Sequence, residues 1–120
     1  MQKKILSAGH NTALLKVRNS IIQAAGYQVV TTKEADLILD LARKGDFAAV
    51  VICSSVPAYQ RRNLARELKR IKPGLPLVMI CAYTEHAEFR TLAEEVIIAE
   101  HGVSQPLVEA ISKLAGEPEL

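Results

Sequence analysis

Four side chains that can do chemistry stand singly at the ends of apolar runs: His10, Cys53, Cys81 and Glu100. Thiolate, imidazole and carboxylate groups are the ligands that zinc and similar borderline metals prefer. If His10, Cys53 and Cys81 met, they would offer two thiolates and an imidazole, and Glu100 or His101 would add a fourth ligand. Whether they meet depends on the elements that carry them.

Short apolar runs alternate along the chain with segments of helical periodicity. The runs predict strands at 4–8, 27–30, 47–53, 77–81 and 96–99. The segments that follow predict helices, including one from about 58 to 71 and a last one at 104–115. Alternation of strands and helices predicts an α/β fold in which a five-stranded parallel sheet is covered by helices on both faces. We expect a single domain that spans residues 1–120.

Each helix should turn one apolar face towards the sheet. The first helix, capped by Asn11 or Thr12, is predicted to bury Leu14, Val17, Ile21 and Ala24. The second helix is predicted to open with Thr31 and Glu34, which have the spacing of a capping box, and its core candidates are Leu37, Ile38 and Leu41.

All strands of a parallel sheet end at one edge, where open α/β sheets place their ligands. We therefore expect Gly9, His10, Cys53, Cys81 and Glu100 to lie near one another at this edge. Two interpretations stay open for the thiols. They belong to a metal, ligand or redox site together with His10, or they fill strand ends as small apolar residues, the commonest fate of a buried free cysteine. A Cys53–Cys81 disulfide is disfavoured, because adjacent parallel strands hold side chains in poor bridging geometry.

Three segments of the chain carry a resemblance to a known family: 22–29, the pair Val56 and Pro57, and 79–83. With them, the chain from Ile5 to Leu114 resembles the CheY-like receiver domain of two-component response regulators. The proline lies four residues after Cys53, where the family places one after its phosphoacceptor. The resemblance implies a three-layer, flavodoxin-like (βα)5 sandwich with the strand order 2-1-3-4-5.

The family's functional residues do not carry over. Its acidic pair would fall on Gly9 and His10, its phosphoacceptor aspartate on Cys53, its hydroxyl residue on Cys81 and its lysine on Glu100. The resemblance thus implies a degenerate phosphorylation site. Mg²⁺ prefers hard oxygen ligands, which Gly9 and His10 lack, and Glu100 would repel a phosphoryl group.

We therefore expect a non-enzymatic pseudo-receiver of phosphorelay signalling that works by protein contact, without a cofactor and without a metal. In the family, the face of the fourth helix, fifth strand and fifth helix commonly mediates dimerisation, which implies a homodimer as one candidate. The spacing between Cys81 and Glu100 is shorter than in the family, so the fourth helix is expected to be short.

One concentration of charge stands out on the third predicted helix. Its cations are Arg61, Arg62, Arg66, Lys69 and Arg70, with Glu67 opposing them. This basic strip can be a solvated helix face, a protein-docking face or a grip for phosphates. No aromatic residue is interleaved for base stacking and the formal net charge is only +2, so a protein partner is favoured over nucleic acid.

Bulk composition narrows the setting. The chain has 120 residues, 49% of them hydrophobic, and no apolar run that approaches the length of a membrane span. Its two cysteines stand in apolar surroundings, which suits reduced thiols better than a secreted disulfide framework. We expect a cytoplasmic protein that makes no contact with a membrane.

Overall fold

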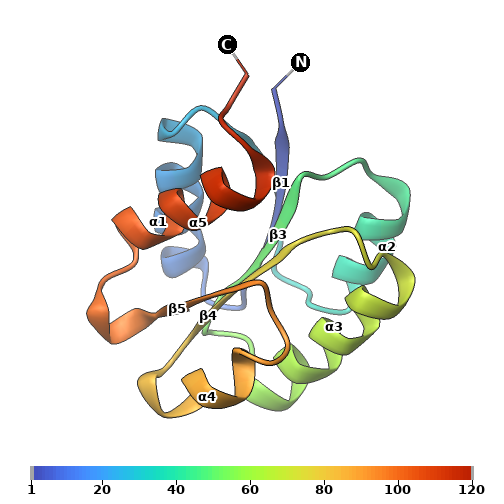
Figure 1. The fold of residues 1–120 in the computed structure, drawn as a ribbon, viewed down its shortest axis with the longest axis vertical. Helices are drawn as coiled ribbons and strands as arrows, with labels where there is room; N and C mark the ends of the chain where they lie inside the picture. The colour runs from blue at the N-terminus through green and yellow to red at the C-terminus, as the bar shows by residue number, and fades with distance from the viewer. Residues whose placement is uncertain (1, 120) are drawn as a thin grey trace.

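The computed structural model describes residues 2–119. Its five parallel strands are β1 (Lys4–Ala8), β2 (Gln28–Thr32), β3 (Ala49–Ile52), β4 (Leu77–Cys81) and β5 (Glu95–Ile98). They form one sheet in the order β2-β1-β3-β4-β5, which confirms the α/β class and the predicted strand order (Figure 1).

The helices are α1 (Thr12–Ala24), α2 (Leu37–Lys44), α3 (Ala58–Ile71), α4 (His86–Phe89) and α5 (Ser104–Ala115), with 3-10 turns η1 (Tyr83–Glu85) and η2 (Ala99–His101). Helices α1 and α5 cover one face of the sheet, and α2, α3 and α4 cover the other (Figure 1). The fourth helix is short, as its sequence spacing predicts. Within residues 2–119 every helix falls short of the length and apolarity that crossing a bilayer requires.

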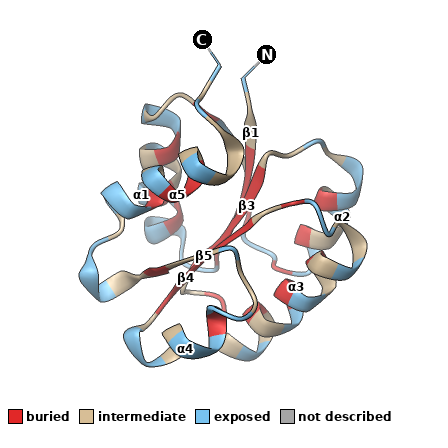
Figure 2. Ribbon diagram, in the orientation of Figure 1, coloured by how far each residue is buried: buried red, intermediate tan, exposed pale blue. Residues whose placement is uncertain are grey.

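The core has two layers because successive side chains of a strand point to opposite faces of the sheet. From β1, Ile5 joins the layer under α1 and α5, whereas Leu6 joins the layer under α2, α3 and α4. The four residues of β3 are fully buried, as expected for the central strand of a covered parallel sheet (Figure 2).

Helix α1 begins as predicted but does not bury the predicted face. Asn11 caps it, since its side-chain oxygen accepts a hydrogen bond from the Leu14 amide at 3.0 Å. The predicted buried face is wrong, because Leu14 and Val17 are 36% and 53% exposed. The residues that α1 buries against the sheet are Leu15, Arg18 and Ile22.

The connection from β2 to α2 does not contain the predicted capping box. Thr31 does not open a capping box, because β2 continues to Thr32 and the Thr31 hydroxyl donates to the Ser7 carbonyl at 3.1 Å. The Thr32 hydroxyl accepts from the Glu34 amide instead, at 3.0 Å. Of the core candidates in α2, Ile38 is buried and Leu37 is 44% exposed.

Candidate functional site

The loops that follow β1 and β3 touch at the carboxyl edge of the sheet. The Cys53 amide donates to the Ala8 carbonyl at 2.8 Å. A Cβ atom built on Gly9 would lie 3.1 Å from the Cys53 Cβ and 3.1 Å from the Ser55 Oγ. Gly9 and Cys53 are therefore neighbours, as the strand order predicts, and the packing leaves little room for a side chain at position 9.

Ser55 holds these two loops together. Its hydroxyl oxygen accepts hydrogen bonds from the amides of His10 at 2.9 Å and Asn11 at 3.2 Å. His10 itself is exposed. Sequence reasoning overlooked Ser55, although a hydroxyl residue two positions beyond Cys53 was the signal that a polar contact could form here.

The two thiols lie on opposite faces of the sheet. In the pairing of β3 with β4, Ile52 lies beside Met79, so Cys53 is level with Ile80 and one position short of Cys81. Cys53 accordingly packs in the layer under α1 and α5, and Cys81 packs in the layer under α2, α3 and α4. Both thiols are free.

This geometry contradicts the metal hypothesis for His10, Cys53 and Cys81. Two side chains that point to opposite faces of a sheet cannot share one ion, and within residues 2–119 no group of three or more histidine, cysteine, aspartate or glutamate side chains is placed to hold one. A disulfide between Cys53 and Cys81 is excluded for the same reason.

Burial also disfavours the thiolate form of both cysteines. It raises the pKa of Cys53, an effect that the neighbouring Arg18 guanidinium partly opposes. It raises the pKa of Cys81 as well, with the carboxylates of Glu85 and Glu100 acting in the same direction. Because the thiolate is the nucleophile and the metal ligand, both cysteines behave as small core residues.

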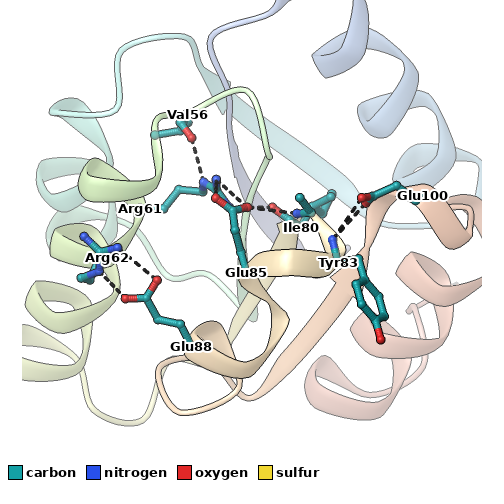
Figure 3. Close-up of polar contacts among 9 residues, drawn as sticks. Val56, Arg61, Arg62, Ile80, Tyr83, Glu85, Glu88 and Glu100 are labelled. Atoms are coloured by element: carbon teal, nitrogen blue, oxygen red, sulfur yellow. Dashed lines mark hydrogen bonds and ion pairs between the residues drawn. The ribbon is translucent and has the colours of Figure 1, made fainter.

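Glu100 fastens the loop after β4 to the turn after β5. Its two carboxylate oxygens lie 3.1 and 3.2 Å from the Tyr83 amide, which donates to them (Figure 3). The Tyr83 and His101 rings also pack together, with centroids 5.9 Å apart. Glu100 is thus a carboxylate that is already engaged in a structural hydrogen bond.

Arg61 corrects the predicted basic strip, because it is 3% exposed and points into the protein. It donates to the carbonyls of Val56 at 2.7 Å and Ile80 at 3.3 Å (Figure 3). Its terminal nitrogen lies 3.0 Å from each carboxylate oxygen of Glu85. The guanidinium also lies over the Phe89 ring, 4.9 Å from its centroid.

Most of the remaining strip is neutralised within the chain. Arg62 forms a two-point ion pair with Glu88, at 2.6 and 3.0 Å. The other pairs are Arg70 with Glu67 and Lys69 with Glu94. Among residues 2–119, Arg66 is the cation of the strip that makes no ion pair, and it is exposed. The strip is therefore much less cationic than its sequence suggests.

A second arginine, which sequence reasoning missed, lies near the carboxyl edge of the sheet, which we call the rim. Arg18 of α1 is 7% exposed, and its Nε atom is buried without a hydrogen-bond partner. It lies near Cys53, whose pKa it affects. The Ser7 hydroxyl on β1 is also buried and unpaired.

Comparison with solved structures shows which known domains have a similar fold. The receiver domain of a CheY-like response regulator from Methanospirillum hungatei JF-1 is similar with a TM-score of 0.79 at 22% identity, over 96% of this chain and 94% of that one. The chain has the receiver fold. The receiver domain of a sensor histidine kinase from Pseudomonas aeruginosa PAO1 matches with a TM-score of 0.82 at 14% identity, over 98% of this chain and 100% of that one.

A third similar structure is the response regulator TrrA from Thermotoga maritima in complex with Mg(2+)-BeF, with a TM-score of 0.79 at 20% identity, over 93% of this chain and 98% of that one. The Pseudomonas domain carries a magnesium ion coordinated in its active-site cleft. No protein-family model matches the sequence. No curated protein matches it either.

Proposed function

We propose that this chain is a receiver-fold signalling domain of the phosphorelay type that acts by protein contact and does not accept a phosphoryl group. The observation that carries this proposal is the chemistry of the rim. Gly9 has no side chain, His10 offers an imidazole, Cys53 is buried, and the carboxylate of Glu100 is bonded to the Tyr83 amide.

Each feature opposes phosphotransfer for a physical reason. Magnesium requires hard oxygen ligands in octahedral geometry, and neither Gly9 nor His10 supplies a carboxylate. Burial raises the pKa of the Cys53 thiol, which disfavours the nucleophilic thiolate. Glu100 adds negative charge where an incoming phosphoryl group would need a cation. These arguments support a non-enzymatic module without a cofactor.

The test is exposure to acetyl phosphate and Mg²⁺, followed by intact-protein mass spectrometry. We expect no phosphoryl adduct, and we expect beryllofluoride with Mg²⁺ to leave the melting temperature unchanged, because a ligand stabilises only a protein that binds it. The response regulator TrrA is the positive control, since its solved structure holds Mg(2+)-BeF. An adduct on this chain at the level of the control would overturn the proposal.

For the protein contact itself, we propose a second copy of the chain on the face of α4, β5 and α5. Strand β5 is at the edge of the sheet, with one hydrogen-bonded neighbour. Its Glu95 forms a 3.0 Å ion pair with Lys113 of α5, which ties the two elements of that face together.

Sedimentation velocity over a concentration series tests the proposed dimer. A dimer is expected for the wild-type chain, and Ile98→Glu should shift the equilibrium towards monomer. A monomer at every concentration would contradict it.

A further inference from the structure

A preformed groove lies between α3 and the segment that joins α4 to β5. Its volume is about 460 Å³, and it is lined by Ala65, Arg66 and Lys69 from α3 and by Thr91, Leu92, Ala93 and Glu94 from the joining segment. Helix α4 has only four residues, and residues 91–94 of the segment that follows it line the groove opposite α3. It lies away from the rim that receives phosphoryl groups in receivers.

Backbone hydrogen bonds hold the outer wall of the groove in place. The amides of Leu92 and Ala93 both donate to the Phe89 carbonyl at 3.0 Å. Glu94 is fixed at two points, because its amide donates to the Leu77 carbonyl at 3.0 Å and its carboxylate accepts from the Leu77 amide at 2.8 Å. A wall fixed in this way loses little conformational entropy when a ligand binds.

The charges of the groove favour an acidic ligand. Lys69 is neutralised by its ion pair with Glu94. Arg66 lies on the edge of the groove, is exposed and makes no ion pair among residues 2–119. Between the charges the lining is apolar: Leu92 and Ala93 lie beside the fully buried Ala65. The pKa of the nearby Glu88 carboxyl is lowered mainly by its hydrogen bond with Arg62, and the Arg66 guanidinium adds to this effect but forms no ion pair with Glu88. Beside an apolar wall, the Arg66 guanidinium suits one carboxylate next to one apolar side chain. It does not suit a polyanion, which needs several cations.

We propose that this groove binds an extended segment of a partner protein in which an acidic residue stands next to an apolar one. The partner's carboxylate would pair with Arg66, and its apolar side chain would cover Leu92 and Ala93. The proposal rests on the proposed function, because it names a surface through which the domain makes protein contacts.

The experiment is a selection of short peptides from a random library on the full chain, followed by affinity measurements on the peptides that emerge. We expect the selected peptides to place Asp or Glu beside an apolar residue. Arg66→Glu should weaken their binding by about tenfold or more. Arg66→Lys should retain most of it. Lys44→Glu is the matched control, because it makes the same charge change at an exposed residue of α2, outside the groove.

Three results would overturn the proposal: no enriched peptide, enriched peptides without acidic residues, or equal binding to wild type and Arg66→Glu. Competition by succinate as strong as that by the peptides would also overturn it and would indicate a small-molecule site. Phosphorylation by acetyl phosphate is measured separately, so a failure of the proposed function and a failure of this groove would be seen in different experiments.

Discussion

At the scale of single residues, Arg61 joins parts of the chain that are far apart in sequence. Its guanidinium contacts the loop after β3, the end of β4 and the η1 turn. Glu85 reinforces the junction, since its carboxylate also accepts from the Ala82 amide at 3.0 Å. Removing one partner of a buried pair leaves the other charge uncompensated, which is more costly than losing an exposed pair.

We predict that Arg61→Ala lowers the free energy of unfolding by about 3 kcal/mol, because it leaves Glu85 unpaired and two buried carbonyls without a donor. Urea denaturation followed by circular dichroism measures this. Arg62→Ala is the control, since Arg62 lies next to Arg61 in sequence and forms an exposed pair with Glu88, and its effect should be much smaller. Equal losses in the two variants would contradict the role of Arg61.

The buried thiol of Cys53 predicts a loss of stability at high pH. Its pKa in the folded protein is above the ordinary value of 9.0, so the unfolded chain releases the proton first as the pH rises. Stability is then full below the unfolded pKa and falls as the pH rises from there towards the folded one. Between about pH 8 and about pH 10, wild type should lose more stability in urea titrations than Cys53→Val does. Identical pH profiles would refute this.

The site illustrates what single residues of a sequence can predict. The juxtaposition of Gly9 with Cys53 follows from strand order alone, because parallel strands end at one edge. The burial of Arg61 could not be predicted, since its partner Glu85 is 24 residues away and charged helix residues are usually solvated. Alternation within strands would have shown that Cys53 and Cys81 face opposite layers, had the register of β3 with β4 been known.

At the scale of elements, α1 buries a different face from the most apolar one, which the sequence predicted to be buried. Leu14 and Val17 remain exposed, and the charged Arg18 is buried with an unpaired Nε atom. Two stripes of the helix have helical spacing, and the sequence favoured the stripe without a charge. Packing selected the other, so hydrophobic periodicity located this helix correctly and oriented it wrongly.

We predict that Arg18→Met raises the free energy of unfolding by about 1 kcal/mol, because it removes a buried charge that no carboxylate compensates among residues 2–119. Methionine has a similar length and can fill the same space. The melting temperature, followed by calorimetry, gives the measurement. Lys16→Met, at an exposed position of the same helix, should leave it nearly unchanged. A fall in stability for Arg18→Met would show that the guanidinium holds α1 in place.

The predicted boundaries agree with the structure for some elements and differ for others. Strands β1 and β4 and helices α3 and α5 occupy the predicted ranges. Strand β2 begins and ends later than predicted, because Thr31 and Thr32 pair with β1 through Ser7 and Ala8. Threonine suits both a strand and a helix cap, and the long-range pairing decided between them.

At the scale of the whole molecule, the sheet has three inner strands and two edges. Strands β1, β3 and β4 are hydrogen-bonded on both sides, whereas β2 and β5 are bonded on one. We predict that, in the monomer, native-state hydrogen exchange is slowest in β1, β3 and β4 and faster in β2 and β5, because edge strands open without unfolding the core. Amides of β5 that exchange as slowly as those of β3 would show that the edge is covered in solution.

The close packing at Gly9 limits which residues this position can accept. A side chain at position 9 would press on Cys53 and on Ser55, and Ser55 holds the amides of His10 and Asn11. A larger residue at position 9 therefore requires Cys53 or Ser55 to shift by a few tenths of an ångström, and a displaced Ser55 hydroxyl would strain two hydrogen bonds. A glycine at position 9 is thus the residue that lets the loops after β1 and β3 close on each other.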